Sequence, residues 1–168
     1  IYELDLGYDP ESKRLTIPIY DKQRNCINLK KYDCFKLTDI KMFSYASGYG
    51  SARLYPWQNL NSDVVYLFEG EPDTILATSL GLAAGTQTGG AVTWKDEFTQ
   101  EFINKAFIVC YDSDNVGQKG ARRVVEALTY TARYVTNVLL PIPQGWGKDF
   151  RDYILAGHTV ADFKKLYE

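Results

Sequence analysis

Histidine and cysteine, the usual zinc ligands, are scarce in this sequence. Its 168 residues include one histidine, His158, and three cysteines, Cys26, Cys34 and Cys110, none of which forms a Cys-x-x-Cys pair. A zinc ribbon therefore cannot be built from this segment alone. An odd and sparse cysteine count also suits a reducing compartment better than a disulfide scaffold, so we expect a cytoplasmic protein with free thiols.

Long apolar runs are also missing. No stretch approaches the roughly 18 apolar residues of a membrane helix, and no secretory signal peptide is visible, so we expect no membrane association. Hydrophobic residues make up 45% of the chain and charged residues 24%, which is ordinary for a globular protein. The length suits one fair-sized domain, or one domain with an appendage.

Positive charge is not in excess, because the formal net charge is −2. This value alone argues against a nucleic-acid-binding protein. The distribution is uneven, however: residues 1–60 carry nine Lys or Arg against seven Asp or Glu, and residues 61–168 carry ten against fourteen. Much of this acidic excess lies in three short clusters, and a bound dication would reverse the local field that they create.

The N-terminal part has the pattern of a β-hairpin. Residues 15–20 and 26–32 are rich in β-forming residues and flank a short polar turn. Pro18 inside the first run indicates an edge strand. Residues 44–62, rich in Ser, Gly, Asn and Tyr, are predicted to be a linker. Residues 1–62 are thus expected to form a small β-rich subdomain and a linker.

Strands and helices are predicted to alternate from residue 63 to residue 168. Uninterrupted apolar runs are typical of strands that are covered on both faces. The alternation implies right-handed crossovers and a parallel sheet. The strands are expected at residues 64–68, 82–84, 106–111 and 134–140, and the main helices from Pro72 to about Gly81, at 96–104, and over about 16 residues after Asp114.

Carboxylates follow two of the predicted strands directly. Glu69 ends the first apolar run, and Asp112 and Asp114 follow the run at 106–111. The carboxyl ends of parallel strands meet at one crevice, where open α/β sheets bind ligands. Carboxylates that share a crevice repel one another unless a cation lies between them, and hard oxygen ligands suit Mg²⁺ or Mn²⁺. The sequence therefore predicts a divalent-metal site that serves phosphate chemistry.

Simpler roles remain open for several of these charges. Asp73 can favour the dipole of the helix that it begins, and Asp114 can act as an N-cap. The Asp-x-Asp pair also occurs in phosphoaspartate hydrolases. Lys119 near the start of the following helix can hold a phosphodiester, although a solvated charged face is the more ordinary reading. Lys148 and Asp149 are candidate site residues only if their loop lines the same crevice as the two strand ends.

Two motifs together resemble the TOPRIM domain. They are VVYLFEGEPD at residues 64–73 and FIVCYDSDNVGQKGA at residues 107–121. This domain is shared by bacterial-type primases, phage helicase-primases, topoisomerases of types IA and II, and some nucleases. GKDFRDYI at 147–154 resembles a further acidic motif of primases and helicase-primases, and RLTIPIYD at 14–21 resembles the segment that precedes their TOPRIM domain.

The resemblance implies a Rossmann-like α/β fold. Its mainly parallel, four-stranded sheet is flanked by helices, forms residues 63–168, and follows the small N-terminal β-rich subdomain. The implied activity is that of a DNA primase: metal-dependent transfer of ribonucleotides into short RNA primers on a single-stranded DNA template. Ribonucleoside triphosphates are the implied substrates, two Mg²⁺ or Mn²⁺ ions the cofactors, and a fused or separate replicative helicase the partner, in a bacterial or phage-infected cytoplasm.

Site residues follow from the matched positions. Glu69, Asp112 and Asp114 match the main acidic residues at the metal site, and Asp73 and Asp149 match additional acidic positions. Asp152 lies three residues after Asp149, which departs from the Asp-x-Asp spacing of some bacterial primases. The expected substrate-binding residues are Lys30, Lys31, Lys119 and Lys148.

Other functions remain open at this point. A TOPRIM nuclease or a topoisomerase-type module would act on DNA phosphodiesters without adding nucleotides. A non-catalytic DNA-binding or assembly domain is a further alternative, disfavoured because the acidic set is complete. A phosphoaspartate hydrolase would leave the Glu69-Gly70 motif without a role.

Overall fold

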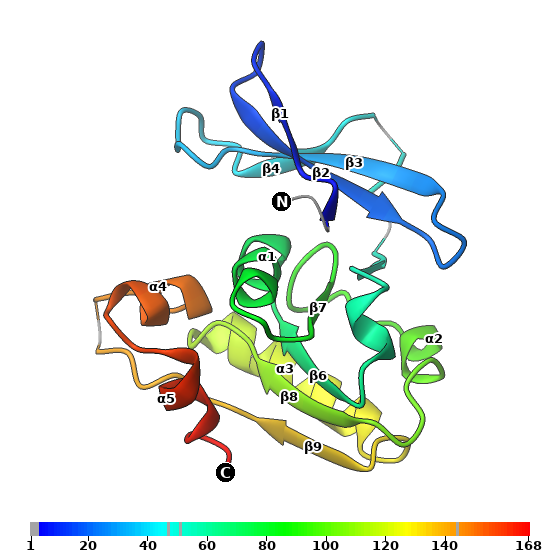
Figure 1. The fold of residues 1–168 in the computed structure, drawn as a ribbon, viewed down its shortest axis with the longest axis vertical. Helices are drawn as coiled ribbons and strands as arrows, with labels where there is room; N and C mark the ends of the chain where they lie inside the picture. The colour runs from blue at the N-terminus through cyan, green and yellow to red at the C-terminus, as the bar shows by residue number, and fades with distance from the viewer. Residues whose placement is uncertain (1–3, 47, 51, 144) are drawn as a thin grey trace.

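The computed structural model describes residues 4–46, 48–50, 52–143 and 145–168. They form two sheets, a small N-terminal one and a larger one that is covered by helices (Figure 1). The small sheet is antiparallel throughout, in the order β1 (Gly7–Asp9), β2 (Arg14–Tyr20), β3 (Cys26–Tyr32) and β4 (Met42–Ser44). The larger sheet has the order β5 (Leu54–Tyr55), β7 (Ala84–Gln87), β6 (Val64–Phe68), β8 (Ala106–Cys110) and β9 (Tyr134–Asn137).

Strands β7, β6, β8 and β9 are parallel, and β5 is antiparallel to β7. The helical segments are the 3₁₀-helix η2 (Asn59–Asn61) and the α-helices α1 (Glu71–Ser79), α2 (Asp96–Thr99), α3 (Asn115–Leu128), α4 (Phe150–Leu155) and α5 (Val160–Lys164). The predicted α/β fold with a small N-terminal β-rich part is confirmed.

Alternation along the central strands builds a core on each face of the larger sheet. Val65 and Leu67 of β6 point to the side of α2 and α3, and Tyr66 and Phe68 point to the side of α1, α4 and α5. Because both faces are covered, these strands read as continuous apolar runs in the sequence. The result is a three-layer sandwich whose strand ends are free to carry polar groups.

The small sheet packs across one edge of this sandwich. Ile17, Ile19 and Tyr32 form a core with Tyr55 of β5 and Ile75 of α1. In Figure 1 the small sheet lies at the top, above α1 and β7. One face of the small sheet is therefore directed at the start of α1, where the acidic motif begins.

The predicted hairpin is confirmed as β2 and β3, but β2 is an inner strand of its sheet. Pro18 is tolerated there because β1 pairs only with residues 14–16 of β2. Beyond Thr16, β3 is the single neighbour of β2 among the residues that the structure describes. Pro18, paired with Leu29, thus lacks a partner on its other side, where its missing N–H would otherwise be needed.

The larger sheet differs from the expected four strands by one short antiparallel strand. Strand β5 lies within residues 44–62, the predicted linker, yet it pairs with Thr86 and Gln87 of β7. It therefore belongs to the larger sheet, although it falls in the part assigned to the N-terminal subdomain. The boundary at residues 62 and 63 stays a prediction.

Two further elements are shorter than predicted. The helix expected at 96–104 is the four-residue α2, and Asn104 takes a left-handed φ of 60° that no helix continues through. The strand expected at 134–140 ends at Asn137. Among the described residues, none of the helices combines the length and apolar character that crossing a membrane requires.

Candidate metal and nucleotide site

Glu69 and Asp112 stand side by side at the carboxyl ends of two neighbouring strands. Strands β6 and β8 are parallel and in register, with Phe68 opposite Cys110, so the residues that follow them leave the sheet at the same edge. Glu69 Oε2 is buried and has no hydrogen-bond partner among the described residues. Burial, with the nearby charge of Asp112, raises the pKa of Glu69.

Asp114 is held by the start of α3. Its side chain caps the helix and accepts a hydrogen bond of 2.8 Å from the backbone N–H of Gly117. A glycine is required at 117, because a Cβ there would meet the carbonyl oxygen of Asp112 and lie 2.7 Å from Glu69 Oε2. The Asp-x-Asp loop and Glu69 are thus packed directly against the first turn of the helix.

Lys148 supplies a positive charge to this pair of aspartates. Its Nζ lies 2.9 Å from Asp112 Oδ2 and 2.5 Å from Asp114 Oδ2. Its carbonyl accepts a hydrogen bond of 2.7 Å from the N–H of Ser113, so the loop that carries Lys148 is joined to the Asp-x-Asp loop. The hydrogen bonds to Asp114 and Asp112 raise the pKa of Lys148.

Asp73 and Asp149 form a second, deeper pair. Asp73 lies in the first turn of α1 and accepts a hydrogen bond of 3.1 Å from the N–H of Arg151. Asp149 caps α4 and forms an ion pair of 3.0 Å with the Arg151 guanidinium. Burial and the charge of Asp149 raise the pKa of Asp73 to about 7.

Asp152 serves the backbone of α4. Its carboxylate accepts hydrogen bonds from the N–H groups of Lys148, at 2.8 Å, and Asp149, at 3.4 Å. In return, Asp149 accepts from the N–H of Asp152, which completes a capping box. Asp152 thus acts as a capping residue of α4, which accounts for its position three residues after Asp149 instead of two.

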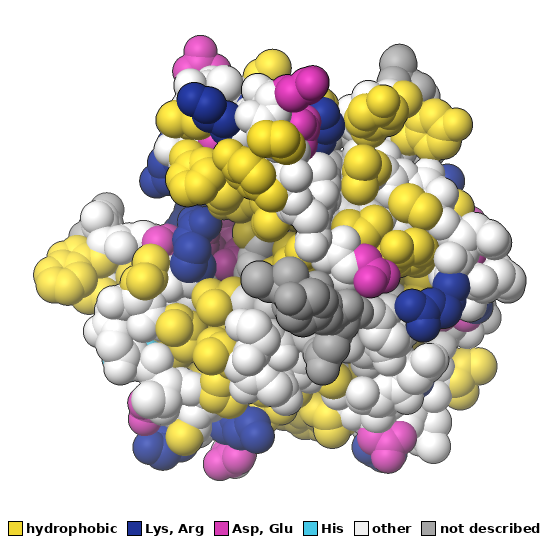
Figure 2. Space-filling view, turned by 45° about the horizontal axis from the view of Figure 1, so that its top comes forward, with side chains coloured by type: hydrophobic (Ala, Val, Ile, Leu, Met, Phe, Trp, Pro, Cys, Tyr) yellow, Lys and Arg dark blue, Asp and Glu magenta, His cyan; other side chains and the backbone are white. Residues whose placement is uncertain are grey.

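Glu69, Asp73, Asp112 and Asp149 line a groove of about 360 Å³ beside the small sheet, whereas Asp114, Lys148 and Asp152 do not line it. Figure 2 shows basic and acidic side chains close together in a hollow beneath the small sheet. The charged residues that line the groove come from both sheets and are Lys30, Lys41, Glu69, Glu71, Asp73, Asp112 and Asp149.

The two adjacent lysines of β3 have separate places. Lys30 pairs with Ser44 and Ile17 in the sheet register, points into the groove, and forms an ion pair with Glu71. Lys31 points to the opposite face and forms an ion pair of 2.5 Å with Asp9. The structure therefore brings Lys30 to the acidic site and leaves Lys31 outside it.

Lys119 is exposed on α3 and does not line the groove. Glu71 and Arg151, by contrast, lie at the site and were not predicted as site residues. Glu71 had a local explanation as a helix-start residue, which concealed its pairing with Lys30. Arg151 carried no signal other than its position beside Asp149.

As placed, no group of three or more His, Cys, Asp or Glu side chains in the described part of the chain is arranged to hold an ion. Lys148 takes the position between Asp112 and Asp114 that a shared cation would need. The partnerless oxygen of Glu69 beside Asp112 nevertheless fits a divalent ion, because it is a buried carboxylate oxygen that no hydrogen bond among the described residues satisfies. Glu69 and Asp112 are therefore the residues best placed to hold an ion, and the carboxylate of Asp114 is occupied by its ion pair with Lys148.

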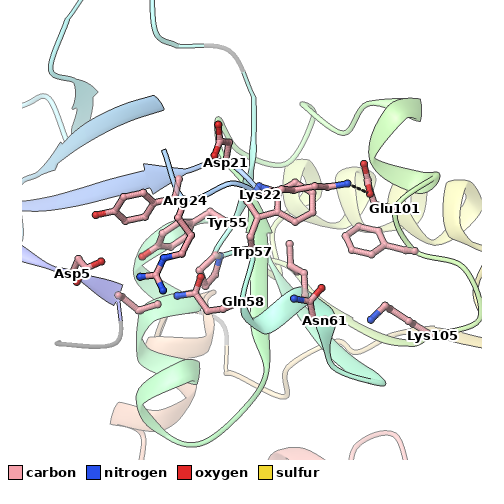
Figure 3. A pocket seen from close by; sticks show the side chains of 15 residues that line it. Asp5, Asp21, Lys22, Arg24, Tyr55, Trp57, Gln58, Asn61, Glu101 and Lys105 are labelled. Carbon is pink, nitrogen blue, oxygen red and sulfur yellow. Dashed lines mark hydrogen bonds and ion pairs between the residues drawn. The ribbon is translucent and has the colours of Figure 1, made fainter. Parts of the chain in front are cut away.

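A larger cavity, of about 500 Å³, lies elsewhere between the two sheets. Figure 3 shows Lys22 reaching beside Trp57 toward Glu101, with which it forms an ion pair. Arg24 and Lys105 also line this cavity. It contains none of the predicted site residues, so the smaller acidic groove is the candidate site.

Comparison with known proteins finds a DNA primase among the relatives of this chain. A DNA primase of Enterococcus faecalis is 28% identical over 119 residues, which cover 62% of this chain and 18% of the relative. The chain thus spans less than a fifth of the length of that relative.

Several solved structures share the fold over nearly the whole chain. The primase fragment of the bacteriophage T7 primase-helicase superposes with a TM-score of 0.72 at 18% identity, over 97% of this chain and 65% of that one. The Escherichia coli primase catalytic core gives 0.65 at 22%, over 90% and 50%. A DnaG primase catalytic domain bound to single-stranded DNA gives 0.65 at 20%, over 95% and 54%.

A family model also matches directly. The model described as Toprim-like covers residues 66–154, which is just over half of the 168 residues and includes Glu69, Asp112 and Asp149. The chain belongs to the Toprim-like family, and its relatives in sequence and fold are DNA primases.

Proposed function

We propose that this chain is the catalytic core of a DNA primase, which joins ribonucleotides into short primers on single-stranded DNA. The observation that carries the proposal is the groove itself. The acidic ends of β6 and β8 face Lys30 of the small sheet across a space lined by both sheets. A polymerase of this kind needs carboxylates for metal ions and a cation for the phosphates of the incoming nucleotide.

The likeness to primase structures supports the same assignment. It extends over 97% of the chain in the T7 primase fragment and thus includes the small sheet, which lies outside the Toprim-like match. A nuclease or a topoisomerase-type module would have no evident need for this sheet beside its acidic site.

The carboxylates are proposed to bind two Mg²⁺ or Mn²⁺ ions. Glu69, Asp112 and Asp114 hold the catalytic positions, and Asp73 and Asp149 form the deeper part of the same acidic wall. When bound, such ions stabilise the charge that develops at the α-phosphate and on the leaving pyrophosphate. Asp73 and Asp149 are linked through Arg151, which keeps this part of the wall ordered.

The cationic residues are proposed to orient the nucleotide. Lys30 reaches the groove from the small sheet, opposite the carboxylates, and is suited to bind a triphosphate. Lys148 neutralises Asp112 and Asp114, and with a metal ion bound to these carboxylates its ammonium group would be available to bind phosphate. Lys31 and Lys119 lie outside the groove, so they are not placed to bind a triphosphate within it.

The proposed partners are a single-stranded DNA template and a replicative helicase in the cytoplasm. The template is supported by the related catalytic domain that was solved with single-stranded DNA. The helicase is supported by the T7 protein, in which primase and helicase are one chain.

The direct test is RNA synthesis. The protein is incubated with single-stranded DNA, Mg²⁺ or Mn²⁺, and labelled ribonucleoside triphosphates, and short RNA is expected. Asp112→Asn should abolish the product while leaving the circular-dichroism spectrum and melting temperature nearly unchanged. An active Asp112→Asn enzyme, or DNA cleavage without nucleotide addition, would contradict the proposal.

A further inference from the structure

Trp146 is a large aromatic side chain on the surface, two residues before Lys148, which contacts Asp112 and Asp114. It lies in the segment between β9 and α4, which runs along the left edge of the molecule (Figure 1). Its exposed fraction is 74%. Figure 2 shows a hydrophobic projection at the same edge, next to the hollow that contains charged side chains. The indole has a large apolar face, and at this exposure a flat ligand could cover it.

The backbone on both sides of Trp146 is fixed. Its N–H donates a hydrogen bond of 3.0 Å to the carbonyl of Pro143. Gly147 is pressed against Asp152, where a Cβ would collide with the carboxylate, and the N–H of Lys148 donates to Asp152 Oδ2 at 2.8 Å. The backbone of Trp146 is therefore held by hydrogen bonds at residue 146 and at Lys148.

The indole ring itself has no partner. Among the described residues, the structure contains no ring contact, cation–π contact or hydrogen bond that involves the Trp146 side chain. Trp57 and Trp94 differ from it, because they pack in the core on the α3 side of the larger sheet. Trp146 is the tryptophan of this chain that is placed to receive a flat ligand.

We propose that Trp146 stacks on an unpaired nucleobase of the single strand that enters the acidic site. Two residues later, Lys148 contacts Asp112 and Asp114, so the Cα of Trp146 lies within about 7.6 Å of the Cα of Lys148. Unpaired bases bind aromatic side chains through their faces, without sequence preference. A base stacked on Trp146 would therefore lie beside the loop whose Lys148 side chain reaches Asp112 and Asp114. The inference rests on the proposed function of the site.

The test measures binding and fluorescence in the same titration. A fluorescein-labelled dT₁₂ oligonucleotide is titrated with the protein in the presence of Mg²⁺, and unlabelled dT₁₂ is used to follow tryptophan emission. We expect Trp146→Ala to weaken binding about 5- to 100-fold, the range of base–aromatic stacking, and Trp146→Phe to keep most of the affinity. Emission should be quenched on binding in the unmodified protein, and the quenching should be lost in Trp146→Phe.

Tyr130→Ala is the matched control. Tyr130 is 93% exposed and follows the far end of α3, which begins at the acidic site and is 14 residues, or about 21 Å, long. Its removal should leave affinity and quenching unchanged.

The outcomes separate this inference from the proposed function. If the protein makes primers but Trp146→Ala binds dT₁₂ as the unmodified protein does, the inference is wrong and the function stands. Emission that responds to protein concentration but not to dT₁₂ would indicate a contact between protein copies and would also overturn it. Failure of the unmodified protein both to bind DNA and to make primers would overturn the function and, with it, this inference.

Discussion

Lys30 and Glu71 form a buried ion pair that joins the small sheet to the start of α1. Only 12% of the Lys30 side chain and 5% of the Glu71 side chain are accessible. The pair stands at the rim of the groove and connects residues 41 positions apart in sequence. This ion pair therefore fixes how far the small sheet lies from the start of α1. It also neutralises one charge on each side of the groove.

The first prediction concerns this pair. Lys30→Met should lower the free energy of unfolding by about 3–5 kcal/mol, because it leaves the Glu71 charge buried without a partner. Adding Glu71→Gln should restore part of the loss. Urea unfolding measures both effects. Lys31→Met is the control on the opposite face of the same strand: it should leave nucleotide affinity unchanged, whereas Lys30→Met weakens it. Equal effects of the two changes on nucleotide affinity would contradict the assignment of Lys30 to the groove.

The second prediction concerns the packing of Gly117 against Glu69. Gly117→Ala should displace Glu69 and the Asp112 carbonyl, reduce stability, and weaken Mn²⁺ binding measured by calorimetry. Gly120→Ala, one turn later in α3, meets the Ala91 carbonyl at 2.5 Å and serves as the comparison. It should also cost stability, but without a change in Mn²⁺ affinity. Loss of metal affinity in both variants would indicate a general defect of α3.

The third prediction is a pH dependence of stability caused by Asp73. Its pKa of about 7 in the folded chain exceeds the value of 3.8 in the unfolded chain. The folded protein therefore keeps a proton that the unfolded chain has lost, and stability should fall as pH rises from about 4 to 7, by up to about 1.4 kcal/mol per pH unit. Asp73→Asn, whose amide oxygen still accepts from Arg151, should flatten this decline and be more stable than the unmodified protein at pH 8. Urea unfolding in EDTA across pH 4–8 measures this, and parallel curves for the two proteins would refute it.

The fourth prediction concerns Lys148. Lys148→Met removes the charge that separates Asp112 from Asp114, so the two carboxylates should repel each other in EDTA and lower the melting temperature. Mg²⁺ should then raise the melting temperature more in this variant than in the unmodified protein. Lys119→Met, an exposed change on α3, should give the same Mg²⁺ response as the unmodified protein. A smaller Mg²⁺ response in Lys148→Met would mean that Lys148 is not in competition with the ion.

Much of the fold could be predicted because its signals are local. The apolar runs at 64–68 and 106–111 and the position of Asp114 as an N-cap are properties of short segments, and the structure has β6, β8 and the start of α3 there. The strand predicted at 82–84 was misplaced, because β7 runs from Ala84 to Gln87 through residues that were predicted to be a loop. Strand β5 could not be predicted in this way. It has two residues, which is too few for any periodicity, and it exists because β7 offers it a partner.

The features of the site also differ in whether local sequence predicts them. Strand-end carboxylates could be predicted, since parallel strands bring their ends together. The pairing of Lys30 with Glu71 depends on how two sheets pack, and no local pattern contains that information. The separation of Lys30 from Lys31, in contrast, was available from the sequence, because consecutive residues of a strand point to opposite faces.

The capping box at the start of α4 has a consequence for how related sequences will vary. Asp152 contributes two accepted hydrogen bonds to the backbone of the Lys148-Asp149 loop. Selection at position 152 therefore acts on hydrogen-bond acceptance rather than on charge, and Glu or Gln should replace Asp there without loss of fitness. At Asp149, which lies inside the acidic groove, the same exchange for a neutral residue should be rare. An acidic pair three residues apart thus evolves under two different constraints, although in an alignment the two positions look alike.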